Sequence, residues 1–294
     1  MELLKFKDYS LKIKSKNESF ILFDNFDCSV RTGDVILLSG PNGSGKSTLL
    51  AELTGFDYKY KENECEIERN GMVYYDPENR NIVINKNGYR NAEFSDEYIF
   101  ISQNDEQAFP LIFDCFRSTL VKKANLLNKS IDLYIFEFVK KYGFYPKNNK
   151  KISKLKKHKI HSFLDKINQS SVDNSNILVA SYLFSKVDSL SGGQLKMLNI
   201  MSNLIKYEFS SICFIDEPLN NLDFESVRLF SNIITKIHNE KSELAFLIVT
   251  HCRSILAVNK ILEIDPNNKK IVASDVSFDG CSTCFGKFEN KFYI

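Results

Sequence analysis

The stretch GPNGSGKS, residues 40–47, limits the fold of this chain more than any other feature. It directly follows the apolar segment VILLS and precedes a segment whose leucines have helical spacing. In this order, the glycine amides of the loop and the N-terminus of the helix converge on a phosphate group. The sequence therefore predicts a phosphate loop between a buried strand and a helix that begins at Gly45 and ends at Gly55.

A pair of carboxylates, Asp216 and Glu217, follows a second apolar segment, ICFI. Mg²⁺ prefers one or two carboxylates together with phosphate oxygens and water, which suits Asp216. Glu217 suits a general base or a group that orients an attacking water. In the loop, Lys46 would reach the β- and γ-phosphates, and the Ser47 hydroxyl would bind Mg²⁺. These residues predict hydrolysis of a nucleoside triphosphate, whereas without the phosphate loop the two carboxylates would indicate only a capping pair at a turn.

The remaining pattern alternates between strands and helices. Short strands are expected before residue 40, at LLKFKDYSLKI (residues 3–13), SFILFDNFDCSV (residues 19–30) and VILLSG (residues 35–40). An extra hairpin with the strand IVI and a KNG turn is expected at residues 74–89. Helical spacing dominates from about residue 110 to 189. The last third alternates apolar strands with helices, which implies a mostly parallel sheet covered on both faces. The helical middle is therefore expected to be an insertion into an α/β core.

Composition narrows the class of protein. The 294 residues are 43% hydrophobic with a net charge of +2, so no global bias indicates nucleic acid or an acidic partner. No apolar run approaches the ~20 residues of a membrane-spanning helix, and the charged start MELLKFKDYS is unlike a signal peptide. The seven cysteines are mostly isolated, which fits a reducing compartment. These features predict a soluble intracellular protein.

Four further motifs accompany the phosphate loop and the carboxylate pair. They are Gln103 after the segment YIFIS, LSGGQ at residues 190–194, NNLD at residues 220–223, and Thr250-His251 after LAFLIV. The full ordered set resembles the nucleotide-binding subunit of the ATP-binding cassette (ABC) superfamily. The resemblance covers essentially the whole chain, and the set is far more specific than any single motif.

The resemblance implies a single ABC ATPase domain of the α/β class. Residues 1–103 and 201–294 would form a P-loop NTPase (RecA-like) core with an N-terminal antiparallel β subdomain. Residues 104–200 would form an inserted helical signature subdomain with a lysine-rich insert.

The same resemblance implies ATP and Mg²⁺ as cofactors and assigns roles to single residues. Glu217, His251 and Gln103 would be catalytic, with His251 contacting the γ-phosphate. Ser47, Gln103 and Asp216 would bind the metal. The residues expected to bind ATP are Gly40, Pro41, Asn42, Gly43, Ser44, Gly45, Lys46, Ser47, Thr48, Ser191, Gly192, Gly193, Gln194 and Asp223.

The signature LSGGQ also makes sense as a second anion site. It offers the Ser191 hydroxyl and two bare backbone amides at the expected start of a helix. Because the chain already has a complete phosphate loop, the signature most economically serves a phosphate bound elsewhere. In the family it closes over the γ-phosphate of ATP held by a second subunit, which implies a homodimer or heterodimer of ABC ATPase subunits. A helix-capping turn is the alternative.

The chain departs from the family's pattern in two places. An aromatic residue that stacks on adenine is expected near Ile13, which is not aromatic, so Tyr9 and Phe20 are the candidates. The arginine that often follows the signature is replaced by LKM, residues 195–197. Hydrolysis should survive the second departure, because Glu217 and His251 are intact.

Two stretches lie outside these motifs. Residues 140–161 contain nine lysines and no acid, which indicates either a solvated helical face or contact with phosphates of lipid headgroups or nucleic acid. Few aromatic residues interleave this stretch, so stacking on single strands is not indicated. Cys281 and Cys284 form one CxxC, whose default interpretation is a turn with small buried thiols and whose alternative is metal or redox chemistry.

The leading functional prediction is the ATPase subunit of an ABC transporter, powered by ATP-driven closure and reopening of a dimer. Separate integral-membrane subunits would form the pathway, and the protein would be cytoplasmic, peripheral at the inner face of the cell membrane. The alternative is a soluble non-transport ABC ATPase acting on nucleic acid or in a regulatory or defence complex. The resemblance does not favour nucleic acid. Repair-type members of the family insert long coiled coils between the phosphate loop and the signature, and translation-factor members carry two cassettes, whereas this sequence has no sustained heptads there and one cassette.

Overall fold

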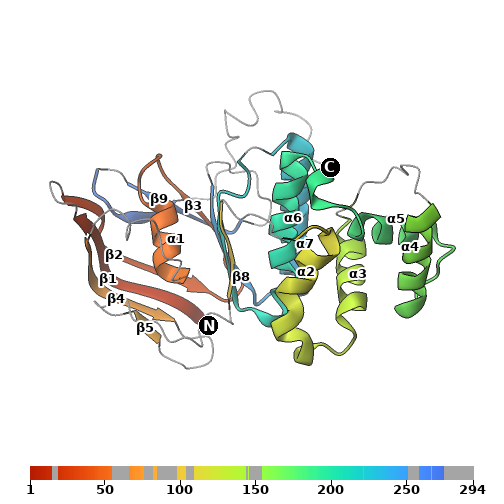
Figure 1. Cartoon of the computed structure of the whole chain (residues 1–294). Coiled ribbons are helices and arrows are strands. Elements are labelled where there is room, and N and C mark those ends of the chain that lie inside the picture. Colours follow the sequence, from red (N-terminus) through yellow and green to blue (C-terminus); the bar gives the residue numbers. More distant parts are fainter. Residues whose placement is uncertain are drawn as a thin grey trace, which may run out of the picture. The chain divides into compact units, whose positions relative to one another are not determined.

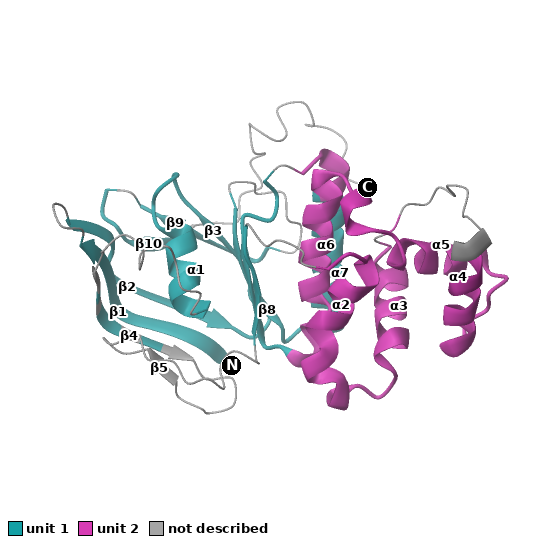
Figure 2. Cartoon of the chain, viewed as in Figure 1, with its two compact units in different colours: residues 1–103, 210–220, 227–294 teal, residues 104–209, 221–226 magenta. Residues whose placement is uncertain are grey.

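Two β-sheets with a helix between them, and a separate group of helices, make up the structure (Figure 1). This computed structural model describes residues 1–14, 19–54, 66–75, 82–84, 98–103, 109–143, 145, 154–220, 222–250, 258–265 and 267–274. The chain divides into two units, shown in Figure 2. The first comprises residues 1–103, 210–220 and 227–294, and the second comprises residues 104–209 and 221–226.

The first sheet of the first unit is antiparallel, with the order β2-β1-β4-β5. Its strands are β1 Glu2–Lys14, β2 Ser19–Arg31, β4 Glu66–Tyr75 and β5 Ile82–Ile84. The strand predicted at IVI is therefore confirmed and pairs with β4, whereas the KNG turn lies outside the described residues. The strands predicted at residues 3–13 and 19–30 are confirmed as β1 and β2, which have 13 residues each. Bulges let both strands continue past polar residues, where Asp8 and Asn25 adopt positive φ angles of 49° and 47°.

The second sheet is mostly parallel, with the order β10-β9-β3-β8-β7-β6, as predicted. Its strands are β3 Val35–Ser39, β6 Tyr98–Ile101, β7 Ile212–Asp216, β8 Ala245–Val249, β9 Lys260–Ile264 and β10 Ile271–Ser274. Only β10 pairs antiparallel, with β9. Every residue of β7 and β8 is buried, which explains their uninterrupted apolar sequences.

Helix α1 Lys46–Thr54 joins the two sheets into one core. Its side chains Leu49, Leu50 and Leu53 pack in a cluster that includes residues of β1, β2, β3, β7 and β8. Figure 1 shows the helix lying beside both sheets. Since α1 begins directly at the phosphate loop, this packing fixes the loop relative to both sheets.

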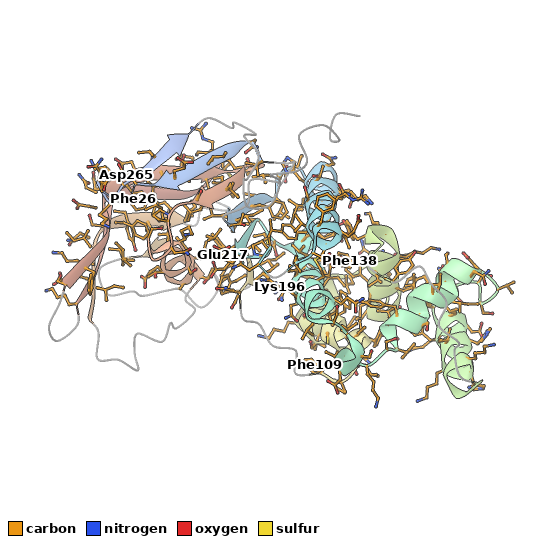
Figure 3. The ribbon with its side chains drawn as sticks, turned by 90° about the horizontal axis from the view of Figure 1, so that it is seen from above. Phe26, Phe109, Phe138, Lys196, Glu217 and Asp265 are labelled. Carbon is orange, nitrogen blue, oxygen red and sulfur yellow. The ribbon has the colours of Figure 1, made fainter. Side chains whose placement is uncertain are left out.

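The second unit is helical, as predicted for residues 110–189. Its elements are α2 Ile112–Leu120, η3 Val121–Leu126, α3 Ile131–Tyr142, α4 Lys154–Lys166, α5 Asn174–Leu183, η4 Val187–Ser189, α6 Gly192–Leu204 and η5 Tyr207–Phe209. Buried aromatic side chains hold them together, including Phe138, which Figure 3 labels among the helices. Helix α7 Phe224–Glu240 begins in this unit and continues in the first. In the described part of the chain, we find no helix with the length and apolarity needed to cross a bilayer.

Candidate functional site

The candidate site lies where three neighbouring parallel strands of the first unit end. Residue pairing aligns Leu38 of β3 and Asp216 of β7 with the same residue of β8, Val249. The phosphate loop follows β3, Asp216 and Glu217 stand at the end of β7, and Thr250 follows β8. Because carboxyl ends of parallel strands share one edge of a sheet, motifs that are far apart in the sequence meet here.

The phosphate loop closes around its own lysine. Lys46 is buried, and its Nζ donates hydrogen bonds of 2.9 Å to each of the carbonyl oxygens of Gly40 and Pro41. Burial lowers the pKa of Lys46, and the negative charges of Glu217 and Asp216 oppose that shift. The ammonium group is therefore held between the loop and the two carboxylates that the sequence predicted.

Glycine is required at position 45 of the loop. Gly45 has φ of 93°, and a Cβ atom there would lie 3.1 Å from the ring of Phe23 and 3.4 Å from the side chain of Leu22. Both neighbours come from β2, so the antiparallel sheet supports the loop from behind. The sequence analysis missed this role of β2, because no local signal links a loop to a strand about 20 residues earlier. The tip of the loop, residues 41–43, is exposed.

A pair of oxygen ligands suits a Mg²⁺ ion. Ser47 Oγ donates a hydrogen bond of 2.9 Å to Asp216 Oδ1, so a hydroxyl and a carboxylate already lie together. Within the described ranges, no three His, Cys, Asp or Glu side chains form a cluster that could hold a metal. Mg²⁺ fits this site because it usually takes one or two protein oxygens and completes its octahedron with phosphate and water.

Glu217 has an unusual backbone conformation at the end of β7 (Figure 3). Its φ is 46°, a left-handed value that costs about 1–2 kcal/mol for a residue with a side chain. Its amide donates a hydrogen bond of 2.8 Å to the carbonyl of Val249, which ties β7 to β8 just beyond the sheet. The carboxylate is buried beside Lys46. Such strain at a buried carboxylate is typical of a functional position.

The structure says less about the two other predicted catalytic residues, Gln103 and His251. Gln103 is exposed and lies two residues beyond β6, whose Ile101 pairs with Ile215 of β7, so it leaves the same edge of the sheet. His251 lies outside the described residues, although the strand before it, β8, runs between β3 and β7.

The signature LSGGQ forms the start of α6 in the second unit. Ser191 is the N-cap, with its Oγ accepting from the Gln194 amide at 3.4 Å and its own amide donating to Gln194 Oε1 at 3.1 Å. This reciprocal arrangement is a capping box. The helix-capping alternative therefore explains these two residues.

The capping box does not explain Gly192. This residue is exposed, and a Cβ atom built on it would meet no atom of the chain within 4 Å. Its amide and that of Gly193 lie in the first turn, where a helix offers no carbonyl acceptor. Among the described residues nothing requires the glycine, so its small size suits the close approach of another molecule.

Asp223, which the resemblance assigned to ATP binding, has a local structural contact. Its Oδ1 accepts a hydrogen bond of 2.8 Å from the amide of Ser226 in the first turn of α7, and that bond is the main cause of its lowered pKa. The side chain is exposed at the start of α7. Its neighbour Asn221 lies outside the described residues.

The two candidates for stacking on adenine differ in exposure. Tyr9 is only 2% exposed and packs between Phe6 and Phe26, with ring centroids 5.5 and 5.6 Å away, so this candidate is wrong. Phe20 on β2 is 52% exposed. It lies two residues before Leu22, whose side chain is next to Gly45 of the phosphate loop.

A cavity of about 520 Å³ in the first unit is separate from these residues. It is lined by residues of β1, β2, β9 and β10, among them Lys5, Cys28 and Lys260. Burial raises the pKa of the Cys28 thiol to about 11, so the thiol stays protonated and unreactive near neutral pH. The cavity contains none of the predicted nucleotide-binding residues.

The parallel sheet, the phosphate loop and the adjacent carboxylates define a P-loop nucleotide-binding protein. Comparison with known families makes this more specific: the chain matches the family described as "ABC transporter" over residues 23–220, and it belongs to that family. As a member of it, the protein is an enzyme that binds and hydrolyses ATP.

The individual relatives have low sequence identity to this chain, but the similarity covers most of its length. The chain is 26% identical to the lipoprotein-releasing system ATP-binding protein LolD of Wigglesworthia glossinidia brevipalpis, over 90% of this chain and 94% of that one. It is 27% identical to the iron-sulfur cluster assembly protein SufC of Plasmodium falciparum, over 99% of this chain and 70% of that one. A solved dimeric ATP-binding cassette, in a post-hydrolysis state with ADP and Pi, has the same fold. Its TM-score is 0.58 at 19% identity, with 94% of this chain and 99% of that chain covered.

Replacement of Lys46 by alanine should abolish ATP binding, because it removes the ammonium group held at the phosphate loop. Fluorescent ATP titration measures the effect. Lys236→Ala, which changes an exposed lysine on α7, is the matched control and should bind normally. Unchanged ATP affinity in the Lys46 variant would contradict the role of the loop.

Replacement of Phe20 by alanine should weaken ATP binding by about 1–3 kcal/mol, the usual value of stacking between a base and an aromatic ring. Affinity for inorganic triphosphate, which has no base, should stay the same. The control is Ile21→Ala, at the neighbouring exposed position. If both variants weaken ATP binding equally, Phe20 does not stack on adenine.

Proposed function

We propose that this protein is the ATPase subunit of an ABC transporter, and that it works as a pair with two ATP molecules bound between subunits. The observation that carries the proposal is Gly192, an exposed glycine at the first position of α6, where an added Cβ atom would point into open space and meet no described atom within 4 Å. An anion site presented outward, in a chain with its own phosphate loop, favours a nucleotide shared with a second subunit. The second subunit is either an identical chain or a related ABC ATPase.

In this proposal the phosphate loop and β7 hold the nucleotide. Lys46 exchanges its carbonyl partners for the β- and γ-phosphates, while backbone amides of the loop bind the remaining oxygens. Ser47 and Asp216 hold Mg²⁺, which neutralises charge on the phosphates. Gln103 completes the metal site. The contact of Ser47 with Asp216 supports this arrangement, because both ligands are already within 2.9 Å of each other.

Hydrolysis uses the carboxylate at the end of β7. Glu217 orients the attacking water and accepts its proton, and the nearby ammonium group of Lys46 stabilises negative charge that develops on the phosphate. His251 contacts the γ-phosphate. Ser191, Gly192, Gly193 and Gln194 bind that phosphate from the second subunit, with Asp223 beside them.

Closure of the pair on ATP and reopening after hydrolysis would drive the membrane partner. The lipoprotein-releasing ATP-binding relative supports transport, since its name places it in a releasing system. The protein would then lie at the inner face of the cell membrane, bound to integral-membrane subunits. The similarity to an iron-sulfur cluster assembly protein, whose name mentions no transport, supports only the non-transport part of the second candidate. That candidate is a soluble non-transport ABC ATPase acting on nucleic acid or in a regulatory or defence complex.

An ATP-dependent dimer is the first test of the composite site. Glu217→Gln should slow hydrolysis and accumulate a dimer in ATP, measured by light scattering during gel filtration. Adding Gly192→Arg should remove that dimer without loss of ATP binding to the monomer, because the new side chain occupies open space and leaves the Ser191 cap intact.

The matched control is Asn174→Arg, an exposed substitution at the first position of helix α5. It adds the same side chain at an equivalent place in another helix and should leave the dimer intact. A dimer that persists with Gly192→Arg, or is lost with both variants, would contradict the assignment.

Transport and the alternative differ in what stimulates hydrolysis. In the transporter, purified protein alone hydrolyses ATP slowly, and reconstitution with its membrane-spanning partner in vesicles should raise kcat. Single-stranded and double-stranded nucleic acid should have no effect. Stimulation by nucleic acid, with no membrane protein needed, would refute transport and favour the second candidate.

A further inference from the structure

An exposed patch in the second unit combines positive charge with apolar side chains. It lies at the end of α2 and in η3, and consists of the exposed residues Arg117, Val121, Lys122 and Leu126, the η3 patch. Val121 and Leu126 are each 58% exposed. No acidic residue occurs between residues 115 and 130. Positive charge and solvent-facing hydrocarbon therefore occur together on one short segment.

The lysine-rich stretch at residues 140–161 lacks this combination. In α4 the apolar side chains Ile160 and Leu164 are buried, and the exposed side chains from residue 157 onward, such as Lys157 and Lys159, are polar. Lys140, at the start of the stretch, is held by Asn176 at 2.7 Å and by Asp173 at 3.8 Å. The described part of the stretch thus exposes positive charge without exposed hydrocarbon.

We propose that the η3 patch binds the surface of an anionic lipid bilayer. Arg117 and Lys122 would meet lipid phosphates, while Val121 and Leu126 insert at the boundary between headgroups and acyl chains. Amphipathic segments bind membranes by this pairing of buried apolar area with electrostatic attraction. The combination identifies the partner. Positive charge complements anionic headgroups and exposed hydrocarbon suits the acyl-chain boundary, whereas neither feature alone requires a membrane.

Aliphatic side chains favour a bilayer over nucleic acid at this patch. Single-stranded nucleic acid is bound through aromatic rings that stack on bases. The aromatic residues nearest in sequence, Phe116 and Tyr134, are buried in the helical core. The membrane contact is additional to the transport proposal and does not depend on it, since it requires neither ATP nor a second subunit.

Co-sedimentation of the full chain with vesicles tests the contact. Binding should be strong to vesicles of phosphatidylcholine with phosphatidylglycerol, weak to phosphatidylcholine alone, and reduced by salt. The double variant Val121→Ser/Leu126→Ser should lower the partition coefficient about tenfold or more. Arg117→Gln and Lys122→Gln should each lower it about fivefold.

Val172→Ser is the matched control, because Val172 is an 86% exposed valine of the same unit that lies outside the patch. It should bind vesicles like the unchanged chain, and circular dichroism should show that every variant is folded. No binding to anionic vesicles would overturn the proposal. The proposal would also be overturned if the chain bound oligonucleotides as strongly as anionic vesicles, and if the charge variants weakened that binding while Val121→Ser/Leu126→Ser did not.

Discussion

The parallel pairing of β3, β8 and β7 is the constraint on which the rest of the structure depends. Because these strands are apolar and buried, they stack in register at the centre of a sheet, and their polar ends are brought to a single edge. The Ser47–Asp216 hydrogen bond then joins the phosphate loop to β7. A hydrogen bond to a charged group contributes about 1.5–3 kcal/mol, enough to hold the two motifs in one geometry.

Two residues carry features that folding alone does not explain. Glu217 is buried in a left-handed conformation beside a buried lysine, although an uncharged residue that tolerates positive φ would fit that turn more easily. Gly192 opens a helix where any residue would fit, and it leaves open space above its backbone. Both features are understandable if the chain contacts two phosphates. Glu217 would act on the phosphate bound in the chain's own loop, and Gly192 would contact a phosphate bound by a second subunit.

Much of the fold and of the site could be predicted because the signals are local. The phosphate loop lies between a strand and α1, the signature begins α6, and the carboxylates end β7. The prediction that failed depends on a distant contact. Tyr9 is buried because its ring packs against Phe6 and against Phe26 of the neighbouring strand β2. The local role of Ser191 as a helix cap was visible in the sequence, but the empty space at Gly192 was not.

The predicted site residues differ in how much structural support their roles have. Lys46, Ser47, Asp216 and Glu217 lie together in the first unit. The signature belongs to the second unit, and its role rests on exposure rather than on a contact. His251 and the cysteines of the CxxC lie outside the described residues, so the interpretations of both stay predictions.

Mixing two inactive variants tests the central claim, a nucleotide shared between subunits, most directly. Lys46→Ala keeps the signature and loses the phosphate loop, whereas Gly192→Arg keeps the phosphate loop and loses the signature. If the site is composite, a mixed dimer contains one intact site, so ATP hydrolysis should reappear on mixing and reach a maximum near equal amounts. If each subunit completes its own site, the mixture stays as inactive as either variant alone, and the claim is contradicted.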